Sequence, residues 1–209
     1  MTTAVWRNGY NGRMDLTPEE NALVGNAPWL LAKGSATTKL RDHLEAAHLA
    51  LMPLVLGEHR DWLCPEGFDI HAVQVARGES LHGTPYQYLD FPKYFRRDEA
   101  FTFRTLIWWG RALCICWILQ GPHLAERRRA LAERRLVPLP GMGAWFGGDP
   151  WDWEGFVPLD SVPPEALEAS SFLKVGRMLP LTPEVLGRSG LSDAVTDTFH
   201  ALLPLVARG

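Results

Sequence analysis

The sequence has few of the features that mark a secreted or a membrane protein. Its 209 residues include three cysteines, an odd number in a chain long enough to bury a core without disulfides. Residues 1–15 lack the apolar core of a signal peptide. The most apolar run, 106–119, is interrupted by Gly110-Arg111 and is shorter than the about 20 residues that span a bilayer. We therefore expect a cytoplasmic protein with no membrane partner.

Positive charge is scarce as well. Lys and Arg total 21 against 24 Asp and Glu, which gives a net charge of −3. A mildly acidic chain has no general attraction to a phosphate backbone, so we expect no nucleic acid partner. Hydrophobic residues make up 46% and charged residues 22% of the chain, and these values predict a single folded domain over residues 1–209.

The motifs of common catalytic, metal and nucleotide sites are absent from the sequence. None of the seven histidines belongs to a His-x-x-x-His or His-Glu-x-x-His pair, no Gly-x-Ser-x-Gly occurs, and no phosphate-binding glycine loop is present. Cys114 and Cys116 share one face of a predicted strand, but their apolar neighbours are more typical of a core than of a metal site. Cys64 has no base that spacing alone can assign to it. We expect no metal and no cofactor.

Capping residues and apolar spacing predict the helices. Thr17, Pro18 and Glu20 form a capping box that begins a helix, and Gly25-Asn26 should end it. Gly121-Pro122 opens an arginine-rich helix, and the last helix has apolar residues every three or four positions. We expect helices over residues 17–25, 35–51, 122–136, 165–174, 183–186 and 191–204.

Alternating side chains and aromatic or β-branched residues predict the sheet. The connections between these segments are too short for parallel crossovers, so the fold class is α+β with a mainly antiparallel sheet. We expect N-terminal, arginine-rich and C-terminal helices to pack on it. The segment 138–164 is rich in proline, glycine and tryptophan, which predicts an ordered loop packed on the domain. The sheet should have about four strands, near residues 68–77, 84–91, 101–109 and 112–120.

Polar residues interrupt the apolar alternation of these strands. A buried arginine needs an anionic partner, so Arg104 would either pair with Asp90 or face an anionic ligand. Tyr86 and Tyr88 share a face of their strand and can contribute to a pocket there. An open sheet face with ordinary polar residues is the alternative. The predicted ligand-binding residues are Tyr86, Tyr88, Asp90, Arg104 and Arg111.

Two other segments are candidates for binding a protein partner. The arginine-rich helix has five arginines and two glutamates over 126–135, a pattern typical of either a solvated helix face or a docking surface. The loop 145–156 has three tryptophans, which either cover the core or form a platform. The predicted partner-binding residues are Arg127, Arg128, Arg134, Trp151 and Trp153.

Three hypotheses about function remain. The leading one is a non-catalytic binding or accessory protein that uses an aromatic-rich sheet face or the arginine-rich helix. The second is a small-molecule enzyme with its pocket around Asp90 and Arg104, and the third is a homo-oligomeric structural protein whose aromatic loop is buried against a second copy. The segments 85–95 and 103–110 have the look of a motif, but they specify no activity. The sequence therefore leaves the ligand and the partner open.

Overall fold

The structure is a computed structural model that describes residues 15–63, 68–69, 71–133, 139–146, 149–187 and 189–206. The chain divides into two compact units, residues 1–39 and 40–209, and helix α2 (Ala27–Pro53) contains the boundary between them. The expectation of a single domain over residues 1–209 therefore stays a prediction. No helix in the described ranges is both long enough and apolar enough to cross a membrane.

Helix α1 (Pro18–Val24) begins at the predicted capping box. The N–H of Glu20 donates to Oγ1 of Thr17, and the Glu20 carboxylate accepts from the N–H of Thr17 at 2.7 Å. The prediction that the next helix starts near residue 35 was wrong, because α2 already begins at Ala27. Oδ1 of Asn26 accepts from the N–H of Trp29 at 3.0 Å, which supplies the N-cap that periodicity alone did not reveal.

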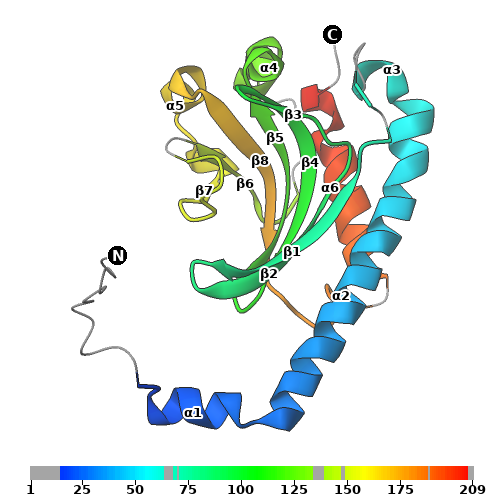
Figure 1. The fold of residues 1–209 in the computed structure, drawn as a ribbon. Helices are drawn as coiled ribbons and strands as arrows, with labels where there is room; N and C mark the ends of the chain where they lie inside the picture. Colours follow the sequence, from blue (N-terminus) through cyan, green and yellow to red (C-terminus); the bar gives the residue numbers. More distant parts are fainter. Residues whose placement is uncertain are drawn as a thin grey trace, which may run out of the picture. The chain divides into compact units, whose positions relative to one another are not determined.

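An antiparallel sheet of eight strands is the centre of the larger unit (Figure 1). The strand order is β1-β2-β4-β5-β8-β6-β7, and the short strand β3 pairs with β4. The α+β class and the antiparallel pairing that the sequence predicted are thus confirmed. The strands are β1 (Gln74–Leu81), β2 (Thr84–Asp90), β3 (Phe95–Arg96), β4 (Glu99–Trp108), β5 (Ala112–Gln120), β6 (Met142–Phe146), β7 (Val157–Pro158) and β8 (Phe172–Leu179).

The prediction of about four strands was wrong. Strands β3 and β7 have two residues each, too few for an alternating pattern, and β6 lies in the proline- and glycine-rich segment predicted as a loop. Strand β8 overlaps the predicted helix 165–174, of which only α5 (Pro164–Ala169) is helical. A Cβ on Gly176 of β8 would lie 1.9 Å from the carbonyl oxygen of Ile115, so glycine permits the close approach of β8 to β5.

The first strand also differs from its predicted bounds of 68–77, since β1 begins at Gln74 and ends at Leu81. The predicted break at 78–83 narrows to a turn at His82 and Gly83, both with positive φ, as a two-residue hairpin turn requires. Residues 183–186, predicted as a helix, form turns. The remaining helical elements are η1 (Leu54–Glu58), α3 (Arg60–Leu63), α4 (Pro122–Ala132), η2 (Leu159–Ser161) and α6 (Gly190–Val206).

The two faces of the sheet are covered differently. Odd-numbered positions of β4 and β5 contact the helices: the rings of Phe103 and Trp117 lie 5.2 Å apart, and Phe199 of α6 lies 5.3 Å from Phe103. Figure 1 shows α6 along this face. Even-numbered positions of β4 and β5 form a second apolar cluster with Trp145 and Trp153, which come from the segment predicted as an ordered loop. Strand β6 and the loop that follows it, rather than a helix, therefore supply the tryptophans of the second cluster.

Candidate functional site

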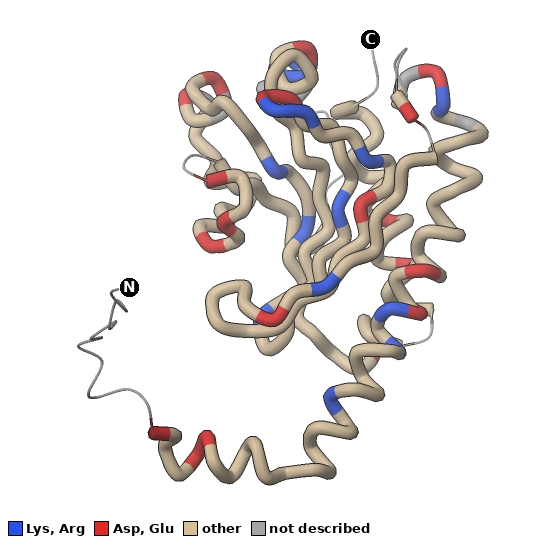
Figure 2. The backbone as a smooth tube through the Cα atoms, viewed as in Figure 1, with Lys and Arg blue, Asp and Glu red and all other residues tan. Residues whose placement is uncertain are grey.

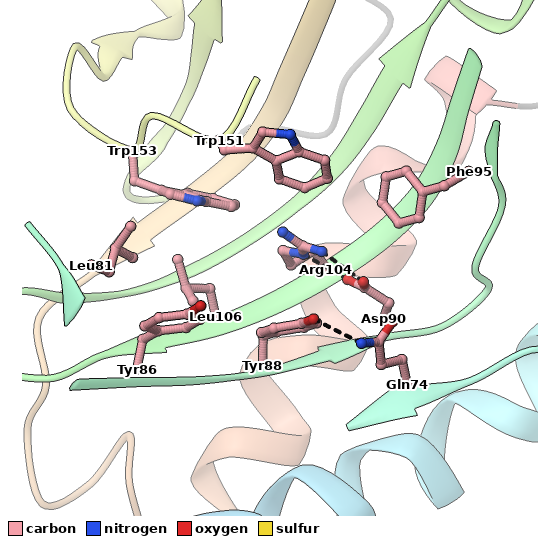
Figure 3. A pocket seen from close by; sticks show the side chains of 10 residues that line it. All are labelled: Gln74, Leu81, Tyr86, Tyr88, Asp90, Phe95, Arg104, Leu106, Trp151 and Trp153. Atoms are coloured by element: carbon pink, nitrogen blue, oxygen red, sulfur yellow. Dashed lines mark hydrogen bonds and ion pairs between the residues drawn. The ribbon is translucent and has the colours of Figure 1, made fainter. Parts of the chain in front are cut away.

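A pocket of about 280 Å³ lies on the second face of the sheet (Figure 3). Its lining residues come from β1, β2, β3 and β4 and from the loop that carries the tryptophans. Half of them are aromatic, and the polar ones are concentrated at one end. They are Gln74, Leu81, Tyr86, Tyr88, Asp90, Phe95, Arg104, Leu106, Trp151 and Trp153.

Strand register brings the polar residues of this pocket together. Gln74 of β1 is paired with Asp90 of β2, Asp90 with Arg104 of β4, and Arg104 with Cys116 of β5. Directly opposed residues in antiparallel strands lie on the same face of a sheet. Residues distant in the sequence therefore form one row across the sheet. Figure 2 shows that several basic positions of the chain lie within the sheet, not only on the helices.

Asp90 and Arg104 form a buried, bidentate ion pair. Nε of Arg104 donates to Oδ1 of Asp90 at 2.6 Å, and Nη2 donates to Oδ2 at 2.7 Å. Asp90 is 0% exposed and Arg104 is 6% exposed. Burial raises the pKa of the Asp90 carboxyl, although the Arg104 guanidinium opposes this rise. Burial opposes ionisation of Arg104 too, but the hydrogen bonds and charge of Asp90 raise its pKa.

Aromatic rings surround the Arg104 guanidinium on the side of the pocket. Its carbon lies 4.4 Å from the ring centroid of Tyr88, 5.1 Å from that of Trp151 and 5.8 Å from that of Phe95. These distances are within the range of cation–π interactions. Figure 3 shows Arg104 between the tyrosines of β2 and the tryptophans of the loop. Asp90 therefore holds one edge of the guanidinium, and aromatic rings lie around it.

Tyr86 and Tyr88 form one wall of the pocket, the tyrosine wall, and this wall depends on a glycine in the neighbouring strand. The rings of Tyr86 and Tyr88 lie 6.2 Å apart and are nearly parallel, with an angle of 11° between them. Nε2 of Gln74 donates to Oη of Tyr88 at 2.9 Å. Gly78 is paired with Tyr86, and a Cβ on Gly78 would lie 2.4 Å from the Tyr86 ring. A side chain at Gly78 would thus displace one ring of this wall.

Trp151 and Trp153 form a second wall of the pocket, the tryptophan wall, and a buried lysine fixes the loop that carries them. Nζ of Lys174 in β8 donates to the carbonyl oxygens of Pro150 (3.1 Å) and Asp152, and it lies 4.3 Å from the centroid of the Trp153 ring. Burial lowers the pKa of Lys174. Trp153 is 3% exposed, whereas Trp151, at the rim of the pocket, is 50% exposed. Lys174 thus holds the backbone on either side of Trp151.

Most of the predicted ligand-binding residues line one pocket. Tyr86, Tyr88, Asp90 and Arg104 do so, together with the predicted partner-binding residues Trp151 and Trp153. Arg111 does not line it: this exposed residue at the tip of the β4–β5 hairpin has its guanidinium carbon 5.4 Å from the centroid of the Trp108 ring. The sequence did not predict Phe95, Leu81 or Lys174. The signal for Lys174 was its place in the sequence: it is one of four lysines in the chain, and it interrupts the apolar run Phe172-Leu-Lys-Val175.

The described arginines of α4 bind mainly to their own chain. Arg127 is buried, donates to the carbonyl oxygen of His123 and to Glu126, and lies over the Phe101 ring. Arg128 donates to the carbonyl oxygens of Glu168 and Ser170 at the end of α5. Arg134, like Cys64, lies outside the described residues. The role of this helix in binding a partner stays a prediction.

The two cysteines of β5 are core residues. Cys114 and Cys116 are buried, and burial raises both thiol pKa values, that of Cys116 to about 12. A thiol in this state is a poor nucleophile and metal ligand. Within the described ranges, no three His, Cys, Asp or Glu side chains are grouped as a metal site.

No protein-family model, curated protein or solved structure matches the chain. The pocket itself therefore carries the functional inference.

Proposed function

We propose that this protein is a non-catalytic binding protein that holds a small organic molecule in the pocket of its sheet. The observation that supports the proposal most is the meeting of two aromatic walls over the Arg104 guanidinium. Pockets for small molecules are concave, mostly apolar and provided with a few polar groups that fix orientation. At about 280 Å³, the pocket is close to the lower end of the usual range, which favours a small ligand.

The polar groups in the pocket favour binding over catalysis. Both oxygens of Asp90, the one carboxylate among the lining residues that the structure describes, accept from Arg104. Burial raises the pKa of Tyr88, which moves its phenol further from neutrality. An efficient general acid or base needs a pKa near the working pH and a free path to the reacting proton. Neither group meets both conditions.

One arrangement favours a small-molecule enzyme as the second candidate. Nε2 of His82 lies 3.1 Å from Oδ1 of Asp152, and His82 directly follows Leu81 of the pocket lining. A carboxylate that orients an imidazole is a common arrangement for a general base. If this candidate is correct, a bound compound is converted, and a His82→Gln variant still binds the compound but does not convert it. Mass spectrometry of the compound after incubation distinguishes the two functions.

Ligand-observed NMR with a chemically diverse fragment set tests the binding function. We expect a group of fragments to bind the native chain and to lose about tenfold in affinity in Trp151→Ala, because stacking on one ring contributes about 1–3 kcal/mol. Trp151 is half exposed, so its removal should have little effect on the fold.

Trp29→Ala is the matched control, since Trp29 is an exposed tryptophan of α2 that does not line the pocket. Fragment affinities should not change in this variant. A chain that binds no fragment, or equal losses in both variants, would contradict the proposal.

A further inference from the structure

The walls of the pocket suit a flat ring system. Tyr86 and Tyr88 occupy alternate positions of β2, and their nearly parallel rings form an extended flat strip. Figure 3 shows Trp151 and Trp153 on the opposite side, with Arg104 and Leu106 between the two walls. Aromatic rings prefer offset-stacked or edge-on contacts with other rings, beyond the area that they bury. An aromatic ligand gains this additional stabilisation from both walls, whereas a saturated ring does not.

The polar end of the pocket offers hydrogen-bond donors. A guanidinium has five N–H groups in a planar fork, and Asp90 accepts one from Nε and one from Nη2. Within the described part of the chain, Nη1 of Arg104 donates to no protein atom, although the residue is only 6% exposed. A planar ligand group with two acceptor oxygens matches this unused edge of the fork.

The charges around the pocket favour an anion over a cation. One basic group, Arg104, is in the lining, and a second, Lys174, lies 4.3 Å from the centroid of the Trp153 ring. The one carboxylate of the described lining, Asp90, is already paired. In the tryptophan loop, Asp152 and Glu154 lie toward His82, whose nitrogens are 3.1 Å from Asp152 and 3.9 Å from Glu154, and the Asp149 carboxylate accepts from the N–H of Trp151. A ligand cation next to the guanidinium would meet repulsion, while an anion adds to the charge-assisted hydrogen bonds.

We infer that the pocket selects a flat aromatic carboxylate, with its rings between the tyrosine and tryptophan walls and its carboxylate on the free edge of Arg104. This inference rests on the proposed binding function and names its ligand class. The Asp90 side chain acts as a positioning group, because it holds the guanidinium with its unused N–H groups toward the cavity.

A series of matched probes tests the class by isothermal titration calorimetry near neutral pH. The probes are 2-naphthoate, its neutral analogue 2-naphthamide, the cation 2-naphthylmethylammonium and the saturated anion decalin-2-carboxylate. We expect 2-naphthoate to bind about tenfold more tightly than the amide, the gain from charge-assisted hydrogen bonds. The cation should bind most weakly, and the saturated acid should bind several-fold more weakly than 2-naphthoate.

The double variant Asp90→Asn/Arg104→Gln assigns the preference to the guanidinium. It replaces the ion pair with a neutral pair that still forms hydrogen bonds, so the fold should persist. In this variant the ratio of 2-naphthoate to 2-naphthamide affinity should fall from about ten to about one. Arg41→Gln is the matched control, because Arg41 is an exposed residue of α2 that pairs with Glu45 and does not line the pocket. It should leave the ratio unchanged.

The outcomes separate the ligand class from the function. Equal binding of acid and amide, tightest binding of the cation, or an unchanged ratio in the double variant would overturn the ligand class and leave the proposed function intact. If no probe binds but other fragments bind and are lost in Trp151→Ala, the class is again wrong. If no fragment or probe binds, both proposals fall.

Discussion

Replacing Arg104 with glutamine should destabilise the fold more than replacing Asp90 with asparagine. Without the guanidinium, a fully buried carboxylate loses the partner that accounts for both of its hydrogen bonds. In Asp90→Asn, the new amide oxygen can still accept from Arg104. The guanidinium also remains beside the ring of Tyr88 at 4.4 Å, and it can turn toward solvent in the pocket.

The expected difference follows from the burial of each group. Removing one partner of a buried ion pair costs about 3–5 kcal/mol, and we assign this range to Arg104→Gln. For Asp90→Asn, one retained hydrogen bond of about 1 kcal/mol and the cation–π contacts offset part of the loss, which leaves about 1–3 kcal/mol. The double variant should lose about 2 kcal/mol less than the sum of the single losses. Urea denaturation followed by circular dichroism measures all three variants.

The pH dependence gives the same prediction a second test. Burial already holds the pKa of Asp90 above its ordinary value of 3.8, and removing Arg104 removes the main group that opposes this rise. A folded state with a raised carboxyl pKa binds more protons than the unfolded state, so its stability falls as pH rises from 3.8 through the folded pKa. The deficit of Arg104→Gln should therefore be smaller at about pH 5 than at about pH 8. A deficit that grows on acidification, or one no larger than that of Asp90→Asn near pH 8, would refute the reasoning.

Two further variants test the walls of the pocket. Gly78→Val should displace the Tyr86 ring and weaken 2-naphthoate binding by about tenfold, as measured by calorimetry. Unchanged affinity would mean that Tyr86 takes no part in binding. Lys174→Met should leave the carbonyl groups of Pro150 and Asp152 without their donor. Hydrogen–deuterium exchange in the segment 149–155 should then become faster while β5 stays protected. Equal protection of this segment in the variant and in the native chain would show that Lys174 does not hold the loop.

The central strands could be predicted because their sequence pattern matches their environment. Strands β4 and β5 are buried on both faces, and both were found as dense runs of aromatic and β-branched residues. Arg104 stood out as a charge within the run of β4, and Asp90 as a charge at the end of the predicted strand β2. Their opposition in the register of β2 and β4 produces the ion pair that was one of the two alternatives. A charge in a buried strand is thus an informative signal, because burying it requires a partner.

Strand β8 could not be predicted because its residues contact several different segments of the chain. Lys174 binds the tryptophan loop, Gly176 permits the approach of β5, and Arg177 donates to the carbonyl oxygen of Pro140. These tertiary contacts break the alternation that a half-buried strand would show. The prediction of a loop over 138–164 failed for a related reason. Prolines and glycines oppose long strands, but β6 needs only five residues because β8 already offers an edge for pairing.

The pocket itself follows from the way in which the second face of the sheet is covered. Trp145 and Trp153 pack in one cluster with the apolar even-numbered side chains of β4 and β5, whereas Tyr86 and Tyr88 on β2 stay half-buried. The loop held by Lys174 leaves part of both tyrosine side chains exposed. The aromatic walls therefore face each other across a space that neither fills. Because the loop and the strands are separate parts of the sequence, only the fold shows that their aromatic residues belong to one site.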